Sequence, residues 1–268
     1  GKGKFGLVSL VHNKQNIYPN RVNENITQFK QGSIISELAV KKNALYKQKS
    51  IVSLKNGKIL IAGISPLSAQ YAETAAEINV YNPETNSVGS GLSFVAFSEH
   101  ICCYEQIENE VYCLYVTFES SLVSKLMIKK ILVNDMTVTD KGNKIIKHLY
   151  TQFNFVKAVK FSDNEAVALL QTGNGKSNIN YGNKGGDLFY CHYQVTNDNN
   201  LINVTRYELL FDECNYYDDI EDYNADIIGL ASGKVFATCQ MKNGKLKGFI
   251  ITTGEEDIKK FDFYSFES

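Results

Sequence analysis

One pattern of apolar and polar positions occurs four times along this chain. Each occurrence has an apolar run rich in β-branched or aromatic residues, a tight polar turn and a second apolar run. Such a pattern is typical of a β-hairpin. The four stretches are residues 50–63, 100–116, 157–171 and 226–239, with turns near Gly57, Asn109, Asn164 and Gly233. Gly3, in the segment KGKFGLV, gives a fifth turn at the head of the chain.

The spacing of these turns indicates a repeat architecture. Successive turns lie 54, 52, 55 and 69 residues apart, and near-equal steps of about 50 residues are typical of propeller blades. In each unit, the apolar hairpin is followed by a second hairpin that is more amphipathic, so each unit has four strands. The turns of these second hairpins are expected at Gln31-Gly32, 81–86, 133–136, 196–200 and 253–257.

The inner strands of each unit are nearly continuously apolar, whereas the outer strands alternate, as expected for a buried axis and a wet rim. We therefore expect a single all-β domain, a propeller of about five four-stranded blades with very little helix. The approximate blades are residues 1–45, 46–97, 98–150, 151–210 and 211–268. The segment AETAAEI (72–78) is the only local competitor for helix, and Pro83 soon follows it.

The first unit starts at the turn that follows an innermost strand, so that strand is missing from it. Two arrangements are compatible with this start. In a closed five-bladed ring, the two chain ends share one blade and the tail KKFDFYSFES (259–268) supplies a strand. Alternatively, the chain is part of a larger ring. We favour the closed ring, and we expect a chain that begins at Gly1 without an initiator Met to be a processed form or a fragment.

One unit resembles a kelch repeat. LKNGKILIAGI (54–64) followed by AEINVYNPETNSV (76–88) matches that family's hydrophobic strand, glycine, loop, second strand and NPET-type turn. Ile64 stands where the family carries a second glycine, and Val88 stands where it carries Trp. The other four units are similar only in turn spacing. The resemblance implies a propeller whose usual role is to bind other proteins, with enzymes such as galactose oxidase in the minority.

Composition narrows the function classes. The chain has 268 residues, with 28 basic and 29 acidic side chains and a net charge of −1. It therefore lacks the excess of positive charge that binds the phosphates of a nucleic acid. No apolar stretch approaches the roughly 18 residues of a membrane-spanning helix. We expect no nucleic-acid partner, no membrane span in this chain and no cofactor.

No catalytic constellation is recognisable. The segment GNGKS (173–177) is similar to a phosphate-binding loop, but Leu170 stands where the first glycine is required. Some five-bladed propellers are glycosidases that use paired carboxylates. Their sugars usually stack on Trp, which this chain lacks. A carbohydrate-active, glycosidase-like enzyme is therefore the alternative and not the favoured interpretation.

A weak calcium site is conceivable in the acidic stretch 212–226, at Asp218, Asp219 and Asp222, because calcium prefers carboxylate oxygens. The spacing is not that of an EF-hand, and a solvated acidic loop is the favoured interpretation. We therefore predict no metal.

The six cysteines suggest disulfides. Cys103 faces Cys113 across a hairpin if its turn has three residues, whereas Cys102 shares a face with Cys113 if the turn has two. Cys214 and Cys239 are expected at the same rim of the fifth unit. Two bridges favour an oxidising, extracellular or cell-surface location, with a cytoplasmic location as the alternative. The sequons at Asn25 and Asn203 are glycosylation candidates, although chance alone predicts about three in so Asn-rich a chain.

Two long loops, 171–187 and 210–225, are expected on one rim, where binding function often concentrates. Their candidate contact residues are Lys176, Tyr181, Lys184, Tyr216, Tyr217 and Tyr223. The opposite interpretation is that these loops are mere expansions without a partner. We expect a non-enzymatic, protein-binding or structural module of a larger cell-surface or extracellular assembly, or alternatively an intracellular kelch-type adaptor.

Overall fold

A computed structural model describes fifteen stretches of the chain. They are residues 5–11, 16–22, 29–31, 49–66, 74–96, 101–120, 123–149, 153–172, 187–195, 202–212, 225–230, 233–241, 243–252, 254–255 and 257–263. All regular elements in these stretches are strands, and they form five antiparallel sheets.

The sheets follow one another in chain order. Sheet 1 contains β1 (Phe5–Val11), β2 (Asn16–Val22) and β3 (Phe29–Gln31). Sheet 2 contains β4 (Lys49–Ser53), β5 (Ile59–Pro66), β6 (Thr74–Asn82), β7 (Ser87–Val88) and β8 (Leu92–Val95). Sheet 3 contains β9 (Ile101–Ile107), β10 (Glu110–Ser120), β11 (Val123–Asn134) and β12 (Thr137–Leu149).

The last two sheets have the same plan. Sheet 4 contains β13 (Phe153–Ser162), β14 (Glu165–Thr172), β15 (Leu188–Val195) and β16 (Ile202–Phe211). Sheet 5 contains β17 (Ala225–Leu230), β18 (Lys234–Gln240), β19 (Leu246–Thr252) and β20 (Lys259–Asp262).

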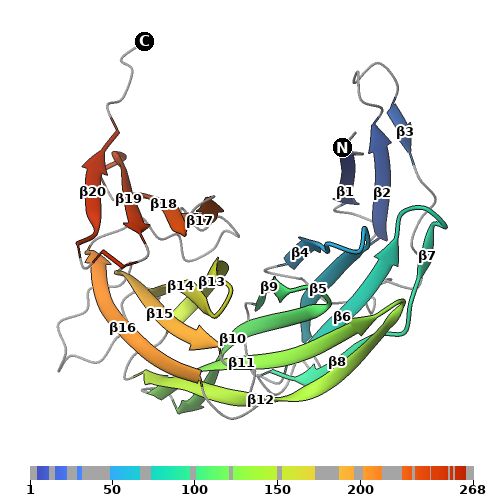
Figure 1. The fold of residues 1–268 in the computed structure, drawn as a ribbon, viewed down its shortest axis with the longest axis horizontal. Helices are drawn as coiled ribbons and strands as arrows, with labels where there is room; N and C mark the ends of the chain where they lie inside the picture. Colours follow the sequence, from blue (N-terminus) through green and yellow to red (C-terminus); the bar gives the residue numbers. More distant parts are fainter. Residues whose placement is uncertain are drawn as a thin grey trace.

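These sheets form a β-propeller, so the predicted fold class is confirmed. Figure 1 shows them around an arc, with β4, β9, β13 and β17 toward its centre. The predicted count of about five blades differs slightly: in the described part of the chain, four sheets have the four-stranded plan and sheet 1 has three strands. In sheet 2, β7 and β8 both pair with β6 and together act as one outer strand.

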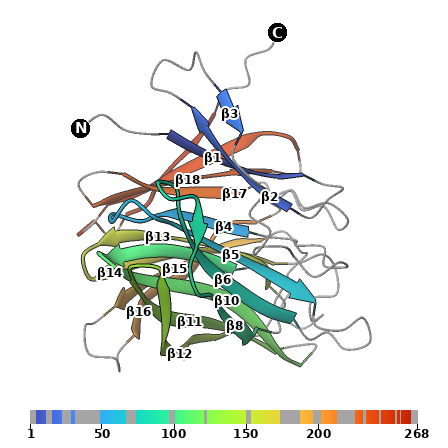
Figure 2. The ribbon, with the colours of Figure 1, turned by 90° about the vertical axis from the view of Figure 1, so that its right-hand side faces the viewer.

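Among the described residues, the two ends of the arc do not meet as the closed-ring prediction requires. Sheets 1 and 5 stand apart in Figure 1, and sheet 1 lies above sheet 2 in the side view of Figure 2. The tail residues 259–262 form β20 and pair with β19 of sheet 5, so this segment does not complete sheet 1. Gln31, expected in a turn, lies in β3 and pairs with Asn20.

Several predicted turns have the backbone that their residue types favour. Gly57, Asn109 and Gly233 each have a positive φ, of 81°, 66° and 65°, between the first and second strands of their sheets. Glycine and asparagine tolerate this left-handed region better than other residues do. The turn at Asn164 joins β13 to β14, whereas Gly3 lies outside the described residues.

Neighbouring innermost strands are joined by side chains that occupy one repeated position. Ser50, Cys102 and Lys157 each lie seven residues before the turn residue of their own sheet. Ser50 Oγ accepts a hydrogen bond from Cys103 N at 2.8 Å and donates one to Cys103 O at 3.3 Å. Cys102 Sγ does the same with Ala158, accepting from N at 3.2 Å and donating to O at 3.6 Å.

The third of these side chains makes an ion pair. Lys157 Nζ lies 2.6 Å from the Asp226 carboxylate of sheet 5. Asp226 also lies seven residues before its turn, at Gly233. Side-chain contacts thus join the inner strands of sheets 2 to 5, which are β4, β9, β13 and β17, one after another around the axis.

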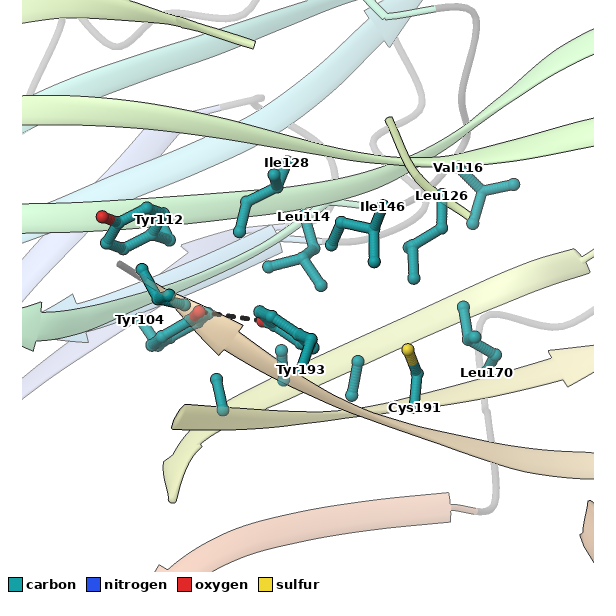
Figure 3. Packing of buried hydrophobic residues seen from close by; sticks show 14 of the residues in the cluster. Tyr104, Tyr112, Leu114, Val116, Leu126, Ile128, Ile146, Leu170, Cys191 and Tyr193 are labelled. Atoms are coloured by element: carbon teal, nitrogen blue, oxygen red, sulfur yellow. Dashed lines mark hydrogen bonds between the residues drawn. The ribbon is translucent and has the colours of Figure 1, made fainter. Parts of the chain in front are cut away.

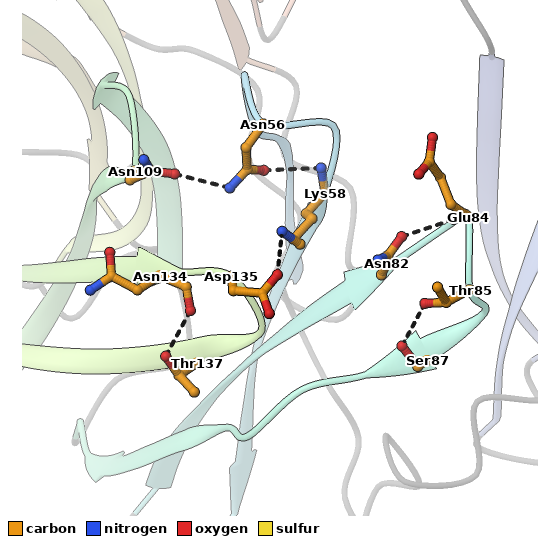
Figure 4. A network of polar contacts seen from close by, with 10 residues as sticks. All are labelled: Asn56, Lys58, Asn82, Glu84, Thr85, Ser87, Asn109, Asn134, Asp135 and Thr137. Carbon is orange, nitrogen blue, oxygen red and sulfur yellow. Dashed lines mark hydrogen bonds and ion pairs between the residues drawn. The ribbon is translucent and has the colours of Figure 1, made fainter.

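A second row of contacts lies at the turn end of the inner strands (Figure 4). Asn56 Nδ2 donates to Asn109 Oδ1 at 2.9 Å, and Lys58 pairs with Asp135 at 2.9 Å, so the turns of sheet 2 contact those of sheet 3. Gln106 Nε2 donates to the carbonyls of Ser162 at 2.7 Å and Asp163 at 2.8 Å in the first turn of sheet 4.

The core is divided into layers between sheets, as a propeller requires. One cluster fills the space between sheets 2 and 3, a second that between sheets 3 and 4, and a third that between sheets 4 and 5. In the second cluster, the buried hydroxyls of Tyr104 and Tyr193 share a hydrogen bond of 2.8 Å among Leu114, Ile128 and Leu126 (Figure 3). The paired hydroxyls avoid the cost of burying an unsatisfied polar group.

Candidate functional site

The strand ends that carry the two long rim loops lie next to each other in sheet 4. Leu188, at the start of β15, pairs with Gln171 of β14 on one side and with Phe211 of β16 on the other. All three are buried, with exposed fractions of 0%, 1% and 7%. The strand ends next to residues 173–186 and 213–224 therefore lie side by side at one edge of sheet 4 and share a buried base.

The predicted contact residues of these loops lie outside the described residues. They are Lys176, Tyr181, Lys184, Tyr216, Tyr217 and Tyr223. The weak calcium candidates Asp218, Asp219 and Asp222 also lie outside them. Within the described stretches, no three His, Cys, Asp or Glu side chains gather in a way that could hold a metal ion.

The outer half of sheet 4 carries a charged cluster that sequence reasoning missed. Arg206 of β16 donates from Nε and from a terminal nitrogen to the two carboxylate oxygens of Glu208, at 3.1 and 2.9 Å. The guanidinium also lies 5.5 Å from the ring centre of Tyr190. Arg206 and Glu208 lie two residues apart on one strand and so share a face. The pattern RYE, around one of the two arginines of the chain, could have revealed this pair.

His192 and Glu165 extend this cluster toward the turn end of sheet 4. His192 Nε2 lies 3.4 Å from Glu165 Oε1, and its ring meets Phe161 edge-on at 4.8 Å. Burial lowers the pKa of His192; the Glu165 charge raises it and the Arg206 charge lowers it further. The imidazole is therefore neutral at pH 7, and Nε2 is a buried atom without a hydrogen-bond partner.

Tyr190 occupies the centre of the same cluster. Its side chain is fully buried, and its hydroxyl has no hydrogen-bond partner. Burial, and then the nearby Glu208 charge, raise the pKa of Tyr190. Sheet 4 thus has a partly exposed Arg–Glu pair beside two buried polar atoms, the Tyr190 hydroxyl and His192 Nε2.

The acidic side chains of the described inner strands are occupied by structural contacts. Glu105 accepts hydrogen bonds from Lys55 N at 2.9 Å and from Asn109 N at 3.1 Å. Asp226 accepts from Lys157 and from Ile227 N. Glycoside hydrolysis needs a pair of carboxylates flanking a substrate, and these two are instead used to join turns and strands.

Cys103 and Cys113 lie directly opposite each other in β9 and β10. The turn between these strands has two residues, but a register shift next to Glu110 restores the pairing that was expected for a three-residue turn. Both thiols are buried and free in the structure. Burial raises the pKa of the Cys103 thiol, and it raises that of Cys102 to about 11 and that of Cys191 to about 12. These thiols are therefore not activated nucleophiles.

The predicted bridge between Cys103 and Cys113 remains a prediction with a favourable geometry. The main-chain N–H and C=O of Cys103 bond to Ser50 and not to β10, so the two cysteines form a non-hydrogen-bonded pair. In such pairs the Cα atoms lie about 4.5 Å apart, which is within the range of disulfides. For protein made in an oxidising compartment, we expect mass spectrometry of a non-reduced digest to find the peptides of Cys103 and Cys113 joined, with a mass two hydrogen atoms below the sum of the separate peptides. The Cys113→Ser variant should lack this joined species. Free thiols at both positions in such a preparation would contradict the prediction.

The second predicted bridge joins Cys239 to Cys214, and Cys214 lies outside the described residues. Cys239 is buried on β18, and its main chain is in register with Ala225 of β17. The glycosylation candidate Asn203 is exposed on β16, whereas Asn25 lies outside the described residues.

Comparisons with known proteins support the fold. No family model matches the chain, and no curated protein matches it. Among solved structures, the fucose-specific lectin of Aleuria aurantia is similar, with a TM-score of 0.58 and 10% identity over 94% of this chain and 71% of the lectin. A Hadza microbial sialidase has a TM-score of 0.51 and 8% identity over 92% of this chain and 54% of the sialidase.

A third similar structure is the sialidase of Trypanosoma rangeli in complex with the inhibitor DANA, with a TM-score of 0.50 and 9% identity over 89% of this chain and 40% of the enzyme. At such low identity these likenesses concern the fold alone. No helix able to cross a membrane was found among the residues that the structure describes. The chain is a β-propeller similar in fold to these lectin and sialidase structures.

Proposed function

We propose that this protein is a non-enzymatic binding propeller and that it recognises another protein through the rim of sheet 4. The observation that carries this proposal is the common base of the two long loops, the buried row of Gln171, Leu188 and Phe211. A rigid base that presents long loops is the usual way in which a scaffold builds a binding surface. The tyrosines predicted in these loops are residue types that dominate binding energy in interfaces.

The proposal includes an extracellular or cell-surface location, within a larger assembly. The favourable register of Cys103 and Cys113 supports it. An intracellular adaptor is the competing location. The same thiol measurement on protein isolated from its native source separates the two, because disulfides persist only in an oxidising compartment.

Carbohydrate binding is the second candidate function, and one observation favours it. The partly exposed Arg206 and Glu208 present a charged donor and acceptor beside the ring of Tyr190, and such groups can hold sugar hydroxyls. A glycosidase is less well supported, because Glu105 and Asp226 are both used in structural contacts.

Removing residues 173–184 tests the proposal. We expect the deletion to abolish capture of the specific protein partner in a pull-down from the native source, because the loop would carry the contact. The melting temperature should change little, since the strand ends at Gln171 and Leu188 remain. Glu84→Ala in the exposed turn after β6 is the matched surface control and should leave capture intact. An unchanged partner profile, or binding to glycans alone, would contradict protein recognition by this rim.

A further inference from the structure

One face of sheet 5 is apolar and open. On β17 it presents Ile228 and Leu230, which are 57% and 45% exposed, and on β19 it presents Leu246, which is 50% exposed. The register places Phe236 directly opposite Ile228. The ring of Phe236 stacks on Phe261 at 5.9 Å and meets Phe263 edge-on at 6.2 Å. We call these six residues the open face.

The same positions in the preceding sheets contact the next sheet. Five residues before the turn stand Val52, Tyr104 and Val159. Val52 packs into the cluster shared with sheet 3, Tyr104 bonds to Tyr193 of sheet 4, and Val159 packs into the cluster shared with sheet 5. In sheet 5 this position is Ile228. Its exposure therefore results from the lack of a neighbouring sheet and not from a change in residue type.

The position three residues before the turn gives the same result. Leu54 and Phe161 are buried in the clusters between sheets, and Gln106 bonds to the first turn of sheet 4. The corresponding residue of sheet 5 is Leu230, which is exposed. Sheet 1, which would follow in a closed ring, stands at the other end of the arc (Figure 1). No sheet in the described part of the chain covers the open face.

Opposite charges stand at the two ends of β17, because Asp226 stays 68% exposed even though it pairs with Lys157. Asp226 lies near the start of β17, on the same face as Ile228 and Leu230, and Lys234 pairs with Leu230 at the far end of this strand. A two-fold axis that crosses the strands at Ile228 exchanges these two ends. It would place Asp226 of one copy near Lys234 of the partner subunit, with Ile228 against its own counterpart. Apolar sheet faces pack against each other in this way in β-sandwiches, and two-fold symmetry is the commonest arrangement in oligomers.

We propose that the open face of sheet 5 docks a second copy of this chain, in a two-fold dimer that buries Ile228, Leu230 and Leu246. The inference does not depend on the rim of sheet 4 or on what that rim binds. It uses only the exposed apolar residues, their covered equivalents and the opposite charges at the two ends of β17.

Sedimentation equilibrium of the 268-residue chain over a range of concentrations tests the dimer. We expect a concentration-dependent mass that approaches twice 30.1 kDa. Ile228→Asp should raise the dissociation constant at least about tenfold, because it buries charged groups against each other. Leu246→Asp changes the same face on a different strand and should have the same effect. It keeps the test valid if the first variant fails to fold, which circular dichroism would reveal.

Leu209→Asp is the matched control. Leu209 is 44% exposed on β16 of sheet 4, away from the open face, and its substitution should leave the dissociation constant unchanged. A chain that stays monomeric at every concentration would overturn the proposal. So would a dimer that Ile228→Asp and Leu246→Asp leave intact. A monomer that both variants destabilise would indicate that another part of the same chain covers the face, which also overturns the proposal.

Discussion

Gln106→Glu is expected to destabilise the protein by about 4 kcal/mol at pH 7, the largest loss of stability that we predict for a single substitution. Gln106 is 2% exposed, and its Nε2 faces three carbonyls of the next sheet, those of Ser162, Asp163 and Glu165, at 2.7, 2.8 and 3.4 Å. The substitution preserves the shape of the side chain but replaces this donor with a carboxylate oxygen. An ionised carboxylate would therefore be buried against carbonyl oxygens that have lost their hydrogen bonds.

The loss should depend on pH in a definite direction. Burial and the facing carbonyls raise the pKa of the introduced carboxyl in the folded state above its unfolded value of about 4.3. Below that unfolded value both states are protonated and the ionisation cost is absent. The cost then grows as the pH rises toward the folded pKa, and it is constant above it. Urea unfolding at pH 4 and pH 7 measures the difference.

The matched control for this variant is Gln240→Glu, at a partly exposed position of β18. It introduces the same charge without burying it and should change the free energy of unfolding by less than about 0.5 kcal/mol. An equal loss for Gln106→Glu at both pH values would contradict the charge-burial account. It would leave only the lost hydrogen bonds as the cause.

The repeat of hairpins was predictable from the sequence because it depends on residues that are close together in the chain. Gly57, Asn109 and Gly233 supply backbone conformations that few other residues tolerate, and all three lie where the pattern indicates. The apolar runs on either side have the period and the β-branched content of strands. The propeller follows from their spacing, since each unit is too small to cover its own apolar faces.

Other features depend on the register and the contacts between strands of a sheet, and the sequence alone does not reveal them. The tail has strand character, but only the register of β19 and β20 shows that Lys259–Asp262 belongs to sheet 5. The pairing of Cys103 with Cys113 depends on a local register shift next to Glu110 that no pattern signals. The cluster of Arg206, Glu208 and His192 joins residues of neighbouring strands, so its members are separated in the chain.

The inner strands show how different chemistries can serve one structural position. A hydroxyl in Ser50, a thiol in Cys102 and an ammonium group in Lys157 all reach the next inner strand. The first two replace the hydrogen bonds that the edge of an innermost strand would otherwise lack.

Gly89→Ala is expected to destabilise the protein by about 3 kcal/mol, because no space exists for a side chain at this position. Gly89 lies between β7 and β8, where its N–H donates to Val80 O at 2.8 Å. A Cβ atom built on Gly89 would overlap the carbonyl group of Met136, in the turn between β11 and β12 of sheet 3. The obstacle is main chain and not a flexible side-chain end, so it cannot simply rotate away. Either sheet 2 or the turn of sheet 3 must shift.

Ser90→Ala is the control for this site, since Ser90 is the exposed neighbour of Gly89 and its substitution adds no atom to the crowded contact. It should change the free energy of unfolding by less than about 0.5 kcal/mol. Urea unfolding of the two variants and the wild type measures both values. Because Ser90 also bridges to Thr137 through its main chain, a shift caused by Gly89→Ala should loosen the whole junction between sheets 2 and 3. Faster amide hydrogen exchange in residues 133–138 of the Gly89→Ala variant would show this, whereas wild-type stability would mean that the two sheets do not pack as closely as the structure has them.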